Sequence, residues 1–168
     1  PVPNEKELAN GKPGYRVEGW YEDQALTRPF TYKTMPAQNL IAYPKWVADE
    51  ISYYVSYIFL DGTTQVNSYT ETYTGLADSV VQPPEVKSFE GYTFDESSRL
   101  TSFKIEPGNP YIGYYYQINT HTLTYQYETN DATGTNIITA QKKYGEDITI
   151  PDPARDGTLS TSDRNHGI

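Results

Sequence analysis

The sequence predicts a mainly β protein with little helix, built from small units that repeat along the chain. Residues 51–59 and 112–118 alternate apolar and polar side chains with a period of two, which is typical of strands with one buried face. The chain has 17 Tyr but only 5 Phe and 2 Trp, and tyrosine suits strands that are half exposed to water. Helix-favouring runs of Ala, Leu, Glu and Lys are scarce, so a helical bundle is not expected.

Composition and charge exclude several classes of function. No cysteine is present, so neither a disulfide framework nor a thiolate metal site can form. The net charge of −9 argues against a nucleic-acid partner, because that affinity comes mainly from Lys and Arg. No apolar run approaches the ~20 residues of a membrane helix and no signal peptide is recognisable, so membrane insertion of this segment is not expected. We expect a piece of a longer protein whose targeting and anchoring regions lie outside it.

The first segment, residues 1–46, begins with a polar stretch in which ELAN could form one helical turn. Residues 14–46 then carry GYRVEGWYED, ALT, PF, TMPA and LIAYPKW. These motifs resemble the second half of the Listeria–Bacteroides repeat, a β-grasp repeat found in tandem on bacterial surface proteins. The sequence departs from the family pattern at Val17, where Phe is preferred, and at Pro44, where Ala is preferred. We expect Trp20 and Trp46 to be core residues of a small sheet, and Pro44 to lie at a strand edge or end because it lacks a donor N–H.

The second segment, residues 51–118, contains the only complete copy of the pattern. Its YTG, GY and closing tyrosine motifs resemble the mucin-binding-protein type of domain, which is also ubiquitin-like. Asp61-Gly62 predicts a hairpin, Pro83-Pro84 predicts an extended connection, and residues 98–105 could form a strand. The core residues predicted for this segment are Tyr57, Phe59, Tyr92, Tyr114 and Tyr116.

The third segment, residues 121–157, repeats the opening half of the pattern. Leu123, Tyr125 and Tyr127 alternate as a first strand, and residues 137–140 suit a second. The phrase YGEDITIP at 144–151 resembles the first half of the Listeria–Bacteroides repeat, which we therefore match to residues 121–153. Residues 158–168 are polar and are expected to be a tail or linker. Self-similarity at about 65–70 residues thus predicts half a repeat, a whole repeat and a second half.

Catalytic chemistry is not expected from these residues. His121 and His166 are the only histidines, no nucleophile elbow surrounds any serine, and no phosphate-binding glycine motif is present. Residues 130–136 offer oxygen ligands but lack the spacing of a calcium loop, so a solvated hairpin loop is the preferred interpretation. The sequence predicts no enzyme activity, no cofactor and no metal.

The tyrosines allow a binding hypothesis beside a structural one. Tyr54 and Tyr115 fall on the opposite side of the sheet from the predicted core and are the candidate ligand-binding residues for a sugar. The alternative is that they are ordinary half-exposed strand residues. The resemblances imply an extracellular protein of the bacterial cell surface, attached to the wall through a region outside this segment. It would act as an adhesin stalk, spacer or adhesion module in host interaction or virulence. Its partners would be neighbouring repeats and a host mucin glycan or surface protein, with an accessory domain of a secreted enzyme as a distant alternative.

Each of the two predicted half-repeats lacks the strands that would complete its sheet. A half sheet leaves an edge and an apolar face open to water. The halves could pair within one chain as a permuted domain, pair between chains head to tail, or lean on the central unit.

Overall fold

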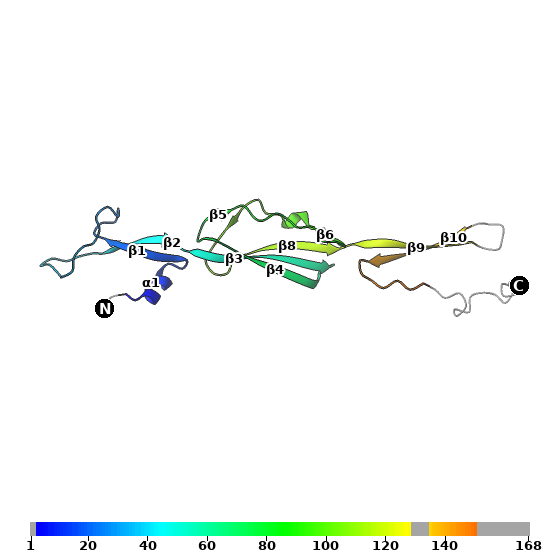
Figure 1. Cartoon of the computed structure of the whole chain (residues 1–168), viewed down its shortest axis with the longest axis horizontal. Helices are drawn as coiled ribbons and strands as arrows, with labels where there is room; N and C mark the ends of the chain where they lie inside the picture. The colour runs from blue at the N-terminus through cyan, green and yellow to red at the C-terminus, as the bar shows by residue number, and fades with distance from the viewer. Residues whose placement is uncertain (1–2, 129–134, 151–168) are drawn as a thin grey trace. The chain divides into compact units, whose positions relative to one another are not determined.

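The computed structural model describes residues 3–128 and 135–150, and it is mainly β. Ten strands, one α-helix and one short 3-10 helix lie in those residues (Figure 1). The chain divides into two compact units, residues 1–118 and 119–168. None of the helices in the described part of the chain is both long enough and apolar enough to cross a membrane.

A short helix and a hairpin begin the first unit. Helix α1, Glu5–Gly11, starts at Asn4, whose side chain accepts a bond from the Glu7 N–H while the Asn4 N–H donates to the Glu7 carboxylate. This capping box explains why the ELAN stretch is helical. Strands β1 (Tyr15–Tyr21) and β2 (Tyr43–Ala48) then pair antiparallel, with an irregularity between Val17 and Gly19.

The central sheet has four strands in the order β4-β3-β8-β6. They are β3 (Glu50–Asp61), β4 (Thr64–Leu76), β6 (Tyr92–Phe94) and β8 (Tyr111–Ile118). Strands β3 and β4 form the hairpin predicted at Asp61-Gly62, where Gly62 has φ +63°. Strands β3 and β8 are parallel neighbours at the centre, and the edge strands are antiparallel to them.

The connection from β4 to β8 covers one face of this sheet. It contains β5 (Val80–Val81), which pairs with β7 (Phe103–Lys104), and the 3-10 helix η1 (Glu96–Ser98). The predicted strand over residues 98–105 is wrong except at 103–104. Asp95 is the reason, because its side chain accepts bonds from the Ser97 N–H and hydroxyl and so caps a turn at the place where that strand would begin.

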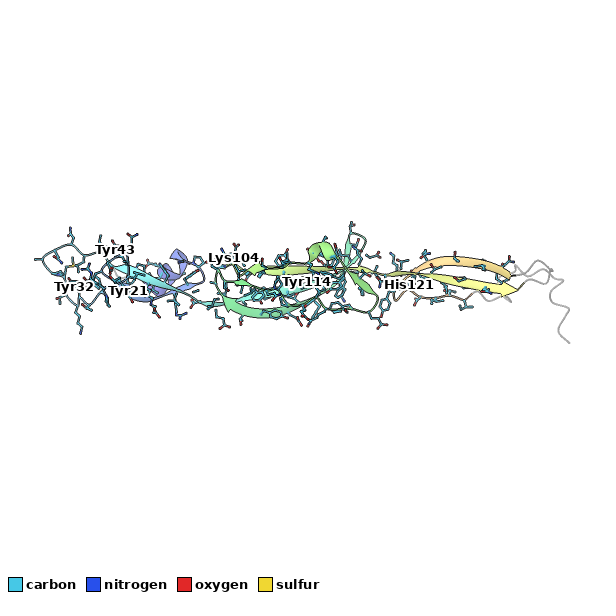
Figure 2. All side chains as sticks on the ribbon, turned by 90° about the horizontal axis from the view of Figure 1, so that it is seen from above. Tyr21, Tyr32, Tyr43, Lys104, Tyr114 and His121 are labelled. Atoms are coloured by element: carbon cyan, nitrogen blue, oxygen red, sulfur yellow. The ribbon has the colours of Figure 1, made fainter. Side chains whose placement is uncertain are left out.

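The core lies between the central sheet and this connection. The side chains buried in it are Tyr53, Val55, Tyr57, Phe59, Ile105, Ile112, Tyr114 and Tyr116. They alternate along β3 and β8 as the sequence predicts, and Tyr114, labelled in Figure 2, belongs to the central sheet and is 1% exposed. Burial of these rings is the main favourable term in folding the unit.

One residue, Asp49, joins the first hairpin to the central sheet. Its N–H donates to the Gly14 carbonyl (2.8 Å), and its own carbonyl accepts from the Ala77 N–H (2.9 Å). Gly14 has φ +78° and packs against Pro107 and Ala77. The Tyr15 hydroxyl donates to Asp78 at 2.8 Å. These bonds fix β1 and β2 to the start of β3.

The second unit is a hairpin of β9 (Thr120–Glu128) and β10 (Thr135–Lys143). A tight turn follows β10, in which Gly145 has φ +74°. The Tyr144 N–H donates to the Asn119 carbonyl at 2.8 Å, so the end of the hairpin is tied to its beginning. The loop residues 129–134 and the predicted tail lie outside the described residues.

Candidate functional site

The central sheet has an inner face, which is covered, and an open face. The inner face carries Tyr57, Tyr114 and Tyr116, all 1% exposed or less. The open face carries the two predicted ligand residues, Tyr54 and Tyr115, both partly exposed. The structure therefore brings these two side chains to the same side of two adjacent strands.

The open face carries small polar and aromatic side chains, together with the aliphatic Ile58 beside Tyr115 and Leu60 beside Gln117. Tyr54 lies beside Tyr111, which is 62% exposed. In the next row Ser56 lies beside Gly113, and its Oγ is 3.0 Å from that of Thr70 on β4. This surface offers hydroxyl groups and flat rings in an uncharged setting.

Tyr115 lies against its own strand at Gly113. A Cβ added at Gly113 would meet the Tyr115 ring and hydroxyl at 3.3 Å, so the absence of a side chain there makes room for the ring. Tyr111 and Tyr115 are four residues apart on β8, a separation of about 13 Å. This separation joins the Cα atoms, and the Tyr115 ring itself lies back over Gly113, towards Tyr111. The sequence reasoning missed Tyr111, although the same alternation that places Tyr115 also places it.

Tyrosine hydroxyls on the inner face hold the covering connection in place. Tyr114 donates to the Pro84 carbonyl at 2.7 Å, and Tyr116 donates to the Lys87 carbonyl at 2.8 Å. Tyrosine thus combines a buried ring with a satisfied hydroxyl. Burial raises the pKa of both tyrosines.

Glu71 on β4 is the centre of a polar cluster at the edge of the core. Its carboxylate accepts bonds from the hydroxyls of Tyr57 (3.2 Å), Tyr69 (2.6 Å) and Tyr73 (3.0 Å), and it pairs with Lys87. Its side chain is 22% exposed. The bond from Lys87, followed by those from the tyrosines, lowers the pKa of Glu71 to about 2. The carboxylate is therefore ionised throughout the physiological range and anchors the connection through Lys87.

A groove of 470 Å³ opens beside the covering connection. Its lining combines the aromatic side chains of Phe89, Tyr92, Phe94 and Tyr116 with four charged ones, Glu85, Lys87, Glu96 and Arg99. Arg99 lies 5.0 Å from the centre of the Phe94 ring and makes two bonds to Glu96. Both cations of the lining are paired, Arg99 with Glu96 and Lys87 with Glu71.

The structure places the remaining predicted residues as follows. Tyr57, Phe59, Tyr114 and Tyr116 belong to the buried core, and Tyr92 packs against it while partly exposed. Trp20 and Trp46 are half-buried on the first hairpin and do not belong to that core cluster. They share one face of the hairpin with Val17, since Val17 pairs with Trp46 and Trp20 pairs with Pro44.

His121 is exposed on β9, and His166 lies outside the described residues (Figure 2). Within residues 3–128 and 135–150, no three His, Asp or Glu side chains gather in a way that could hold a metal ion.

The chain is similar in sequence to two longer proteins. A "Putative membrane protein" of Evansella cellulosilytica is 27% identical over 156 residues, which cover 91% of this chain and 22% of that protein. A "Putative Gly-rich membrane protein" of the same organism is 28% identical over 131 residues, 75% of this chain and 14% of that protein. The chain thus spans less than a quarter of the length of these relatives. No protein-family model and no solved structure matches it.

Proposed function

We propose that this chain is a repeat segment of a bacterial cell-surface protein and acts as a stalk or spacer that carries tension in an adhesin. The observation that carries this proposal is the arrangement of β3 and β8. The central sheet begins with β3 and ends with β8, and these two strands are parallel neighbours at its centre.

This arrangement suits a protein that is pulled along its chain. Tension enters at Glu50, the start of β3, and leaves at Ile118, the end of β8. Because the strands are parallel, the two pulling points lie at opposite ends of the pair, and the force acts along the strands. The hydrogen bonds between β3 and β8 run across that direction, so they are loaded together in shear and do not break one at a time.

The repeat organisation supports the same role. First and last strands that lie parallel at the centre of a mixed sheet are the arrangement expected of a β-grasp unit. The β9–β10 hairpin closes in the same way as the β3–β4 hairpin. In each, the backbone N–H of the residue just after the second strand donates to the carbonyl of the residue just before the first strand. These bonds run from Ala77 to Asp49 and from Tyr144 to Asn119. The word "membrane" in the names of the two relatives favours a place in the cell envelope.

Single-molecule pulling tests the proposal, because a chain without cysteine accepts handles at introduced ones. Handles at Glu50→Cys and Ile118→Cys load the sheet in shear. Handles at Glu50→Cys and Leu76→Cys, which are paired residues, unzip the β3–β4 hairpin in the same protein. We expect a clearly higher unfolding force in the first geometry, and equal forces would refute the tension-carrying role. Antibodies to this segment should also stain intact cells that make the protein.

A second function is favoured by the open face of the central sheet. We propose that Tyr54, Tyr111 and Tyr115 bind a neutral glycan such as a mucin-type oligosaccharide, since the face is aromatic, hydroxyl-rich and uncharged. Tyr111→Ala and Tyr115→Ala should then lose binding on a glycan array while the protein stays folded. Tyr127→Ala, a substitution at an exposed tyrosine on the other unit, is the matched control. If no binding is detected at millimolar glycan concentrations, the glycan-binding function is refuted and the spacer function remains. Neither proposal involves catalysis.

A further inference from the structure

We propose that the β1–β2 hairpin of one copy of this chain completes the β9–β10 hairpin of a second copy, with β2 lying parallel beside β9 as β8 lies beside β3. The inference rests on the repeat organisation proposed above. It adds a specific partner, another copy of this chain, and a specific register.

Backbone features of the chain establish which strands correspond. Strand β1 follows Gly14 (φ +78°) as β6 follows Gly91 (φ +79°). Strand β1 pairs antiparallel with β2, and β6 pairs antiparallel with β8. A single residue, Asp49, separates β2 from β3, and a single residue, Asn119, separates β8 from β9. The first hairpin is therefore equivalent to the β6–β8 half of the central sheet.

The second hairpin is equivalent to the other half of the sheet. After β4, Asp78 takes φ +60° and the Ser79 N–H donates to the Leu76 carbonyl at 3.1 Å. After β10, Gly145 takes φ +74° and the Glu146 N–H donates to the Lys143 carbonyl at 3.0 Å. Strands β9 and β10 thus match β3 and β4. Within the described residues, neither half has its complement, because β1–β2 and β9–β10 are both two-stranded sheets.

Each hairpin has an apolar face at the place where the central sheet has its core. On the second hairpin, Leu123 and Tyr125 lie beside Ala140 and Ile138, and Ile138 is 55% exposed. Leu123 and Tyr125 correspond to the core residues Tyr53 and Val55 when Thr120 is matched to Glu50.

On the first hairpin, Val17, Trp20 and Trp46 form the apolar face. Trp46 lies two residues before the end of β2, as the buried Tyr116 lies two residues before the end of β8. Joining the hairpins would bring both apolar faces to the same side of one four-stranded sheet. A hairpin by itself is marginal in water, and such a union would bury the partly exposed face of each.

The geometry of the central sheet favours a second copy as the partner. The register places Gln117 opposite Leu60, so Ile118 lies level with Asp61, about 36 Å along the sheet from Glu50. The two hairpins are attached at these opposite ends through one residue each. One-residue connections at opposite ends of the sheet favour pairing between copies over pairing of β2 with β9 of the same chain. Pairing between copies joins two different surfaces, and such head-to-tail contacts build open linear assemblies.

Disulfide cross-linking between copies tests the register. Ser56 and Gly113 are partners in the parallel pair, and their equivalents are Gln126 on β9 and Tyr43 on β2. Full-length Tyr43→Cys and Gln126→Cys proteins, mixed in a glutathione redox buffer, should form a disulfide-linked heterodimer. The matched control replaces Gln126→Cys with Ile137→Cys, which is in the same row on β10. Ile137 lies one strand further away, at about 9.5 Å, beyond disulfide reach.

Several outcomes would overturn the proposal. Equal cross-linking in the two mixtures would show that contact is random. An internal disulfide in a dilute Tyr43→Cys, Gln126→Cys double variant would show that the chain closes on itself. In sedimentation, the mass of the unmodified protein should rise with concentration. Ile138→Lys should abolish this rise, while Ile137→Lys, on the other face of the same strand, should not. The pulling experiment concerns only the central sheet, so the spacer function can survive if this inference fails.

Discussion

Replacing Gly14 by alanine should weaken the attachment of the first hairpin to the central sheet. Gly14 has φ +78°, and a Cβ there would lie 2.7 Å from Cγ of Pro107 and 2.9 Å from Cβ of Ala77. The left-handed conformation costs a residue with a Cβ about 1–2 kcal/mol. Forcing a methyl group into a packed contact costs about 1–3 kcal/mol. The expected loss in free energy of unfolding is therefore about 2–5 kcal/mol.

Gly62→Ala separates these two contributions. Gly62 also has a positive φ, +63°, but no atom lies within 4 Å of an added Cβ. It should lose only the strain component of about 1–2 kcal/mol. Urea unfolding followed by circular dichroism gives both values. Tryptophan fluorescence follows the first hairpin alone, since Trp20 and Trp46 both lie there. Equal losses in the two variants would refute the role assigned to the Gly14 contact.

Three further predictions concern the polar cluster, the covering connection and the tryptophans. The pKa of Glu71 is lowered from 4.5 to about 2, so its contribution to stability is present above pH 4.5 and is lost as the pH falls towards 2. Urea midpoints should fall over that window and should fall less in Glu71→Gln; identical profiles would contradict this. Tyr116→Phe removes the bond to the Lys87 carbonyl and should cost about 1 kcal/mol in urea unfolding, and no loss would show that bond to be dispensable. Acrylamide should quench Trp20 and Trp46 only partially, and two freely quenched tryptophans would contradict their half-buried positions.

The strands of the central sheet were predictable because their burial has a period of two. The alternation from Ile51 to Phe59 and from Ile112 to Ile118 is confirmed within β3 and β8. The hairpin at Asp61-Gly62 was predictable for a local reason as well, since that dipeptide tolerates positive φ.

The Glu71 cluster was not predictable, because it depends on contacts between distant parts of the chain. Thr64–Leu76 is a polar stretch in the sequence, and only the pairing of Val55 with Glu71 turns that carboxylate towards the core. Lys87 reaches it from the covering connection. The strand predicted for residues 98–105 of the same connection was wrong for a related reason. There the side-chain cap formed by Asp95 outweighs the alternation of apolar and polar side chains.

The single residue between β2 and β3 restricts how a chain of this kind can change in length. Asp49 bonds to Gly14 and Ala77 through its backbone and to Arg16 through its carboxylate. Inserting one residue there would turn every side chain of β3 to the opposite face relative to β2. In the loop between β1 and β2, the Tyr21–Pro29 bridge and the bond from the Phe30 N–H to the Trp20 carbonyl tie the first part to β1. Residues 31–42 follow these contacts and are mostly exposed, and exposed loops tolerate insertions. Copies of this segment can therefore diverge in loop length while the spacing from the end of one sheet to the start of the next stays constant.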